Sequence, residues 1–201
     1  MENPGERLVG DYLRYIKNCD FIDFNVYTKR AQGEIDVIGV NAAQKQVYVC
    51  EVATHLTTGI QYVNAKAKRP ETSDRLVKKF VKDIDYGNEA FGDYAVTYML
   101  WSPVVRRSDG NPANNQFEHM KKIAHEIKAK KGVDIVFVIN DAYLKAVGEL
   151  RVFARNETKE LKSPVMRFLQ IEEWSKKNSD NIKRRELKDT GMRLTTTASP
   201  V

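Results

Sequence analysis

Residues 33–55 read GEIDVIGVNAAQKQVYVCEVATH, and this stretch decides the fold because it predicts a β-hairpin. Residues 34–40 alternate polar and apolar side chains before becoming largely apolar, and residues 46–52 are rich in valine, tyrosine and cysteine. The polar residues 41–45 link the two strands. If the turn is centred between Ala43 and Gln44, paired positions sum to 87, and Asp36 faces Glu51 directly.

Two carboxylates in this arrangement repel each other, because cross-strand partners lie about 4.5–5.5 Å apart at Cβ. A cation would remove that penalty. Mg²⁺ suits such a pair because it takes hard oxygen ligands, keeps several waters and usually accepts one or two protein carboxylates. The pair therefore points to metal-assisted phosphodiester hydrolysis. The alternative is that Asp36 and Glu51 are two ordinary solvent-facing acids on an antiparallel sheet.

The motif GEID, followed by an apolar strand that ends in Glu-Val-x-Thr, resembles the core of the PD-(D/E)xK nuclease superfamily, over about a quarter of the chain (residues 5–55). The resemblance implies a three-layer α/β/α sandwich with a mixed sheet, as in restriction endonucleases. It implies Asp36 and Glu51 as catalytic metal ligands, with Glu6 on the N-terminal helix as an auxiliary ligand. It also implies Mg²⁺ as the cofactor, with Mn²⁺ as a substitute.

The chain departs from the family pattern at Ala53, where the motif Glu-x-Lys expects a lysine. That lysine is thought to orient or activate the attacking water and to stabilise the developing phosphate charge, which a methyl group cannot do. Three alternatives remain open. Another cation reaches the site, the protein cleaves poorly, or Ala53 is an engineered replacement of a lysine.

Replacement lysines lie just downstream, in two predicted helical pieces that Pro70 separates. Residues 60–69 carry Lys66 and Lys68, the candidates for a catalytic role. Residues 74–86, with Ser73 or Asp74 as the expected N-cap, carry three lysines that are expected to contact DNA, namely Lys78, Lys79 and Lys82. Residues 66–82 hold seven basic and two acidic side chains. A solvated helix face is the alternative interpretation of this charge run.

Two further regions are candidates for DNA contact. The loop over residues 102–115 contains Arg106 and Arg107, and arginine reads guanine edges in the major groove. Residues 176–193 hold seven basic and three acidic side chains, including Lys183, Arg184 and Arg185. We expect this stretch to grip phosphates without sequence preference. A mobile surface loop and a solubilising tail are the respective alternatives.

Composition is consistent with one nucleic-acid enzyme. The chain has 201 residues, a net charge of +6 and a pI of about 9.2, which favours a polyanionic partner. Cys19 and Cys50 lie in apolar surroundings without metal-ligand spacing, which indicates buried thiols in a reducing compartment. No apolar run approaches the ~18 residues of a membrane span, and the first residues are too polar for a signal peptide. We therefore expect a cytoplasmic protein without a membrane partner.

Outside the hairpin, hydrophobic periodicity predicts an alternation of helices and strands. A nuclease domain is expected over residues 1–177, followed by a basic, partly disordered tail over residues 178–201. The predicted helices cover residues 4–18, 116–131, 141–153 and 165–176, and the predicted strands cover residues 21–28, 94–101 and 133–139, the last of the buried kind.

The sequence thus predicts a Mg²⁺-dependent DNA endonuclease of the restriction or DNA-repair type that acts on double-stranded DNA. It would work as a homodimer or with a partner nuclease subunit. A noncatalytic DNA-binding protein or subunit on the same fold is the first alternative, which Ala53 favours. An RNA-processing nuclease with the same metal pair is the second.

Overall fold

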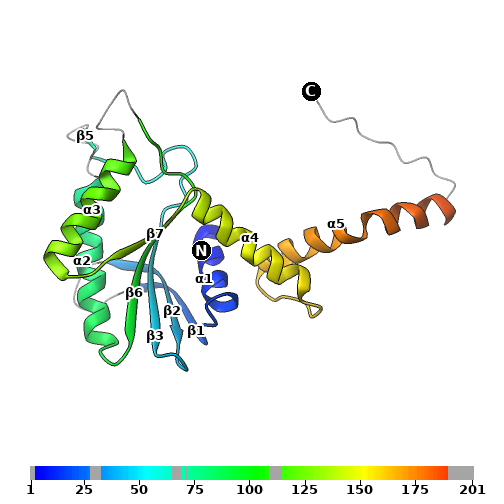
Figure 1. Ribbon diagram of the computed structural model, residues 1–201, viewed down its shortest axis with the longest axis horizontal. Helices are drawn as coiled ribbons and strands as arrows, with labels where there is room; N and C mark the ends of the chain where they lie inside the picture. The colour runs from blue at the N-terminus through cyan, green and yellow to red at the C-terminus, as the bar shows by residue number, and fades with distance from the viewer. Residues whose placement is uncertain (1–2, 28–32, 65–68, 71, 109–114, 190–201) are drawn as a thin grey trace.

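A computed structural model of the chain describes residues 3–27, 33–64, 69–70, 72–108 and 115–189. Five strands form one mixed sheet in the order β1-β2-β3-β6-β7, and helices cover both of its faces (Figure 1). The elements are α1 (Pro4–Tyr15), β1 (Phe21–Tyr27), β2 (Glu34–Asn41), β3 (Gln46–Val52), β4 (Val63–Asn64), β5 (Arg69–Pro70), α2 (Thr72–Ala90), β6 (Ala95–Ser102), α3 (Gln116–Lys131), β7 (Ile135–Ile139), α4 (Asp141–Asn156) and α5 (Pro164–Asp189).

The hairpin has the predicted register. β2 and β3 pair antiparallel with Val37 opposite Cys50 and Val40 opposite Val47, so paired positions sum to 87. β3 runs parallel to β6, and β6 runs parallel to β7. The carboxyl ends of these three strands therefore lie at the same end of the sheet, and Glu51 lies near the carboxyl end of β3.

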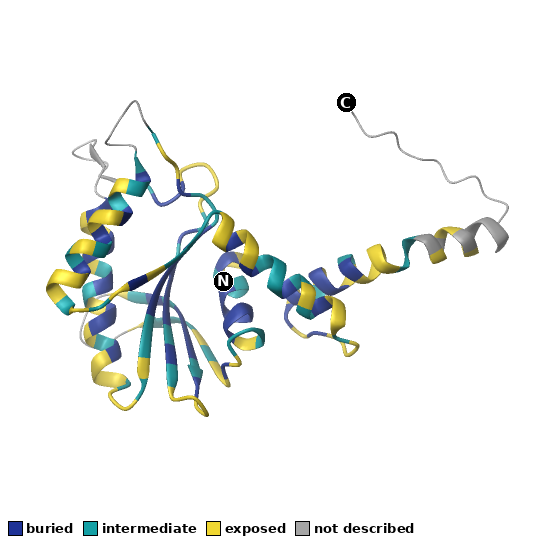
Figure 2. Ribbon diagram, viewed as in Figure 1, coloured by how far each residue is buried: buried dark blue, intermediate teal, exposed yellow. Residues whose placement is uncertain are grey.

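Two apolar clusters, one on each face, hold the sheet between the helices (Figure 2). The α1-side cluster joins α1, α4 and α5 to the sheet and includes Leu13, Trp101 and Leu150. The α2-side cluster joins α2 and α3 to the sheet and includes Phe80 and Ile123. Each fully buried side chain of this size contributes about 1.5–3 kcal/mol relative to exposure, so these clusters fix how α1 and α2 approach the sheet.

Most predicted elements are present, and the prediction of an α/β fold with a mixed sheet is confirmed. β3 and α3 have the expected bounds. β7, expected to be a buried strand, is instead an edge strand of the sheet, and only Ile135 within it is buried. Cys19 and Cys50 were predicted to be buried thiols, and both are free and buried.

The prediction of a helix over residues 60–69 is wrong. Its described parts form the short antiparallel pair β4 and β5. Two local causes act against a helix here. The backbone N–H of Tyr62 donates to Thr72 Oγ1 (2.9 Å), which ties this segment to the first residue of α2. Pro70 also disfavours a helical backbone at the residue before it, Arg69.

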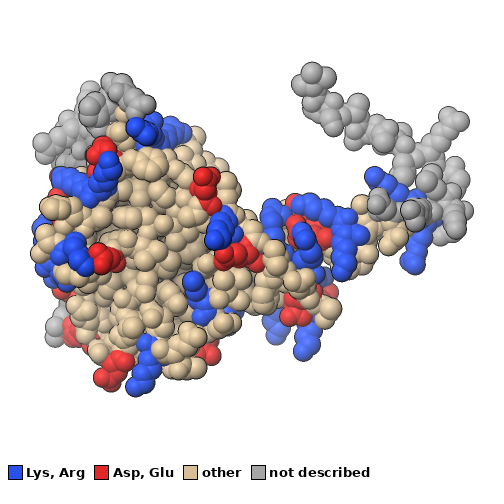
Figure 3. Space-filling view, viewed as in Figure 1, with Lys and Arg blue, Asp and Glu red and all other residues tan. Residues whose placement is uncertain are grey.

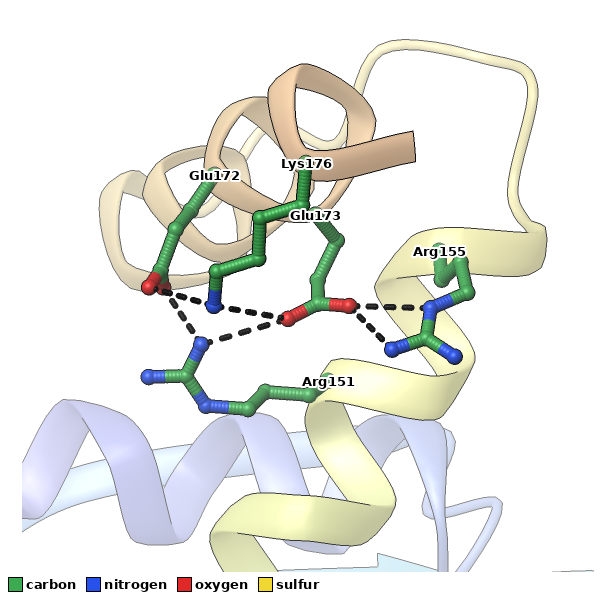
Figure 4. Close-up of polar contacts among 5 residues, drawn as sticks. All are labelled: Arg151, Arg155, Glu172, Glu173 and Lys176. Carbon is green, nitrogen blue, oxygen red and sulfur yellow. Dashed lines mark hydrogen bonds and ion pairs between the residues drawn. The ribbon is translucent and has the colours of Figure 1, made fainter. Parts of the chain in front are cut away.

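Helix α5 continues to Asp189, so part of the stretch predicted as a tail is helical. An ion-pair cluster fixes its first half to α4 (Figure 4). Glu173, which is buried, accepts from Arg155 Nε (2.9 Å) and lies near Arg151, and Lys176 pairs with Glu172 (2.8 Å). Beyond this cluster α5 extends away from the sheet (Figure 1). Among the described residues, no helix combines the length and apolarity needed to cross a membrane.

Candidate active site

Helix α1 places Glu6 near the end of β3. Asn3 caps the helix by accepting from the backbone N–H of Gly5 (2.9 Å), and Pro4 occupies the first turn, where its missing N–H is not needed. A side chain at position 5 would collide with Thr54, so glycine there allows the close approach of α1. Glu6 follows in the first turn, where a carboxylate is favoured by the helix dipole.

Asp36 lies where the ladder between β2 and β3 ends. The last backbone pair of the ladder is Val37 with Cys50, and the next position in this register pairs Asp36 with Glu51. The Asp36 carboxylate lies at this end of the ladder, and its Oδ2 accepts from the backbone N–H of Val52 (2.7 Å). This bond holds the carboxylate against β3, beside Glu51.

The cation that relieves the repulsion between the two acids is Lys79, from α2. Its Nζ donates to Asp36 Oδ1 (3.0 Å) and forms an ion pair with Glu51 Oε2. Only 4% of the Glu51 side chain is exposed, against 15% for Asp36 and 30% for Lys79. The cluster therefore has a buried end at Glu51 and a side open to solvent at Lys79.

Neighbouring charges keep Lys79 protonated. Burial by itself would lower the pKa of Lys79, but the charges of Glu51 and Asp36 outweigh this effect and raise it above the ordinary lysine value. Lys79 is thus a fixed positive charge and hydrogen-bond donor. It is not suited to accept a proton at neutral pH.

The site contains more negative than positive charge. Asp83, one turn after Lys79 on α2, is buried and within hydrogen-bonding reach of Glu51. Burial, and then the charge of Asp36, raise the pKa of Glu51 well above its usual range, although Lys79 opposes the shift. Three carboxylates thus surround one ammonium group, which favours either bound protons or an additional cation.

Two of the acidic side chains, Asp36 and Glu51, fit a divalent cation that keeps several waters. Glu51 Oε1 and Asp83 Oδ2 are buried, and neither has a hydrogen-bond partner within the described part of the chain. No group of three or more acidic, histidine or cysteine side chains there is arranged to hold a metal ion. Asp36 and Glu51 form a pair, with Glu6 close enough for its pKa to be raised by burial and by the charge of Asp36. Two carboxylates with waters match the ligand set that Mg²⁺ usually takes from proteins.

The raised pKa of Asp83 predicts an unusual pH dependence of its contribution to stability. Burial raises its pKa from 3.8 to about 6, so the folded protein binds the proton more tightly than the unfolded chain. The contribution of Asp83 to stability should fall as pH rises from about 4 to about 6 and stay reduced above it. Asp83→Asn should remove this cost of roughly 1–3 kcal/mol at pH 7–8 and change little at pH 4. Urea unfolding in EDTA tests this, with the exposed Asp93→Asn as the control, and an unchanged pH profile would contradict it.

Ala53 is not in the acidic cluster. It packs in a small apolar cluster with Ile60, Val105 and Met120. Lys66 and Lys68, the candidates to replace the missing lysine, lie outside the described residues.

The candidate DNA-contacting residues separate into two groups. Lys79 belongs to the acidic cluster rather than to an exposed basic surface, whereas its neighbours Lys78 and Lys82 are exposed. Arg106, Arg107, Lys183 and Arg185 are exposed as well, and basic side chains are prominent along α5 (Figure 3).

The loop with Arg106 and Arg107 lies beyond the carboxyl end of β6, at the same sheet edge as Glu51. Gln116 fixes this loop. Its side chain accepts from the backbone N–H of Arg106 (3.0 Å) and donates to the carbonyl of Thr58 (2.8 Å) in the segment after β3. The two loops are thereby tied together next to the candidate site.

Sequence reasoning did not single out Asp83, although a signal for it exists. On α2 the buried residues Leu76, Phe80 and Ile84 recur at helical spacing, and Asp83 falls on the same face. An acidic residue on an apolar face requires a partner or a proton. Tyr62 also lies near the cluster: burial raises its pKa, and the charge of Lys79 opposes this shift.

Comparisons with protein-family models, with curated proteins and with solved structures found no match for this chain. The chemistry of the cluster formed by Asp36, Glu51, Lys79 and Asp83 is therefore the basis for assigning a function.

Proposed function

We propose that this chain is a Mg²⁺-dependent endonuclease with a restriction-endonuclease-like fold that hydrolyses phosphodiester bonds in double-stranded DNA. The observation that carries the proposal is the pairing of Asp36 and Glu51 across two adjacent strands with Lys79 between them. Apart from the short pair β4 and β5 and the final helices α4 and α5, the element order is a helix, three antiparallel strands, a helix, a strand, a helix and a strand, which is compatible with the α/β/α sandwich that the resemblance implies.

Lys79 supplies the positive charge that Ala53 cannot. In this proposal it performs the role of the motif lysine from α2 rather than from β3. Because its raised pKa keeps it protonated, it stabilises the negative charge that develops on the phosphate and hydrogen-bonds to oxygen. It does not act as the general base.

Asp36 and Glu51 would hold the metal ion, and Glu6 would assist them. A bound Mg²⁺ supplies polarisation of the phosphate and a water of lowered pKa. The Val52 N–H keeps the Asp36 carboxylate in place, so the ligand is preorganised on the sheet rather than on a loop.

The experiment that tests the proposal compares cleavage of duplex DNA, single-stranded DNA and RNA by the full chain. We expect cleavage of duplex DNA with Mg²⁺ or Mn²⁺ and none in EDTA. Preferential cleavage of RNA would instead support an RNA-processing nuclease.

One observation favours a second candidate, a noncatalytic DNA-binding protein. Lys79 already neutralises part of the charge of Asp36 and Glu51 without a metal. DNA binding that persists in EDTA, with no cleavage of any substrate with either metal, would support this candidate and contradict the nuclease.

The exposed basic residues of α5 predict a steep salt dependence of DNA binding. Each phosphate contact contributes about 0.9 to the slope of log K against log salt concentration. Replacing Lys183, Arg184 and Arg185 with alanine removes three of these charges, and we expect it to lower the slope by up to about three. Fluorescence anisotropy with a labelled duplex measures it.

The control removes three charges elsewhere. Lys145, Lys159 and Lys162 are exposed and lie outside the basic stretches, so replacing them with alanine should leave the slope unchanged. If the triple substitution on α5 also leaves the slope unchanged, Lys183, Arg184 and Arg185 do not contact DNA.

A further inference from the structure

Two residues of the loop after β6 have every backbone polar group hydrogen-bonded. Residues 103–108 lie outside any helix or strand. The N–H of Val105 donates to Asn140 Oδ1 (2.8 Å), and its C=O accepts from Asn140 Nδ2 (3.0 Å). The N–H of Arg106 donates to Gln116 Oε1, and its C=O accepts from the backbone N–H of Gln116 (both 3.0 Å). This part of the loop is therefore bonded as completely as residues inside a sheet.

Buried contacts anchor the same two residues to the end of β3. Val105 is buried and packs with Ala53 in the small apolar cluster. Gln116 is buried as well, and its Nε2 donates to the carbonyl of Thr58 (2.8 Å). Gly59, with φ +59°, lets the segment after β3 come this close, because a Cβ there would lie 2.5 Å from the side-chain oxygen of Gln116. Gln116 thus joins two loops into one fixed unit.

The Arg106 side chain, in contrast to its backbone, is exposed. Its Nη2 donates to the carbonyl of Leu56 (3.4 Å), in the segment that Gln116 also holds. A guanidinium group carries five N–H donors, so this single contact leaves it able to bind an anion. A fixed backbone beneath an exposed arginine is the arrangement expected where a charge must be placed accurately.

The acidic cluster creates a need for such a charge. Asp36, Glu51 and Asp83 surround the single ammonium group of Lys79, so the cluster repels the phosphates of a nucleic acid. Arg106 follows the carboxyl end of β6, which lies at the same end of the sheet as Glu51. A cation at this end would hold the DNA backbone close to the cluster.

We propose that Arg106 binds a phosphate of duplex DNA next to the acidic cluster, and that Gln116 is the positioning residue that, with Asn140, fixes the backbone of Arg106 for this contact. The proposal rests on the proposed function, because it names a substrate contact of the same site. Displacing a group that positions substrate by about 1 Å can cost a factor of 10² even when the change lies away from the chemistry.

The test measures binding of a labelled duplex of mixed sequence by fluorescence anisotropy, with the full chain in EDTA, over a series of salt concentrations. Arg106→Gln should weaken binding about 10-fold or more and lower the salt slope by about 0.9, the value of one phosphate contact. Gln116→Leu should do the same although it removes no charge. A defect in folding alone would reduce the amount of binding protein and leave the slope unchanged.

The chain offers a matched control for Gln116. Gln170 is also a buried glutamine that fixes a loop, since it accepts from the N–H of Leu161 (3.2 Å) and donates to the carbonyl of Glu157 (2.9 Å). Its loop lies between α4 and α5, away from the acidic cluster. Gln170→Leu makes the same chemical change and should leave both the affinity and the slope of DNA binding unchanged.

A second variant loosens the loop from its other side. Asn140 has φ +49°, which glycine adopts readily, and its side chain makes no cap bond to α4. Asn140→Gly therefore removes the two bonds to Val105 with little other change. We expect weaker duplex binding and a lower salt slope, as in Gln116→Leu, and circular dichroism melting confirms that each variant is folded.

A double-mutant cycle shows whether Gln116 acts through Arg106. Adding Gln116→Leu to Arg106→Gln should weaken binding no further. Wild-type affinity and slope in Gln116→Leu, or additive losses in the double variant, would overturn the role of Gln116. Weaker binding by Arg106→Gln with an unchanged slope would overturn the phosphate contact. These measurements need no catalysis, so a lack of cleavage with Mg²⁺ or Mn²⁺ would count against the nuclease alone.

Discussion

Replacing Lys79 with methionine is expected to lower Mg²⁺-dependent cleavage of duplex DNA by about 10²–10³-fold, because a single preorganised charge-stabilising group commonly contributes that much. Lys79 is the cation that lies between Asp36 and Glu51, and its ammonium group is held there by both carboxylates. The neighbouring Lys78 is exposed on the same helix. Lys78→Met is therefore the matched control, and it should cleave at nearly the wild-type rate once bound.

The experiment on Lys79 must distinguish a slower chemical step from a loss of folding stability. Without Lys79 the buried Glu51 has no ion-pair partner among the residues that the structure describes, and removing one member of a buried pair can cost about 3–5 kcal/mol. Lys79→Arg keeps the positive charge and should fold, but its planar guanidinium cannot reproduce the placement of the ammonium group. We expect it also to lose at least about 10-fold in rate.

Single-turnover cleavage with saturating enzyme isolates the chemical step, and circular dichroism melting reports folding. A folded Lys79→Met protein that cleaves at the wild-type rate would remove Lys79 from the mechanism. The undescribed Lys66 and Lys68 would then be the next candidates.

The hairpin could be predicted because its constraints are local. Side chains alternate with a period of two, so the buried face and a short polar turn together allow one register, and Val37 pairs with Cys50 as expected. Helix α3 could be predicted for a similar reason, since its apolar spacing ends at Gly132, whose φ of +69° closes the helix.

The identity of the lysine in the site could not be predicted, because it depends on how α2 crosses the sheet. Successive residues on a helix are separated by about 100°, so Lys78 and Lys79 point in different directions. The packing of Phe80 and Ile84 in the α2-side cluster turns Lys79 toward Asp36 and leaves Lys78 in solvent. That rotation is a property of the packed core and is not visible in the local charge pattern.

The second large effect concerns the two carboxylates. Asp36→Asn and Glu51→Gln should each reduce Mg²⁺-dependent cleavage to background and weaken Mn²⁺ binding measured by calorimetry, because each removes one of the two proposed ligands. Affinity for duplex DNA should stay equal or increase, since one negative charge near phosphate is lost. Asp23→Asn, at an exposed acid on β1, is the control and should change neither property.

The two variants should differ in stability in a way that identifies the site as functional. Asn at position 36 retains an oxygen that can accept from the Val52 N–H, so Asp36→Asn should unfold near the wild-type temperature. Glu51→Gln should be as stable as the wild type or more stable in EDTA at pH 7–8, because burial and Asp36 disfavour the charged form of Glu51.

A buried carboxylate that weakens the fold and yet is required for cleavage would be explained by catalysis rather than by structure. The opposite pattern would count against the proposed site. If Glu51→Gln strongly destabilised the protein and Mn²⁺ binding remained unchanged in both variants, Asp36, Glu51 and Lys79 would form a structural ion-pair cluster, and the noncatalytic DNA-binding candidate would be preferred.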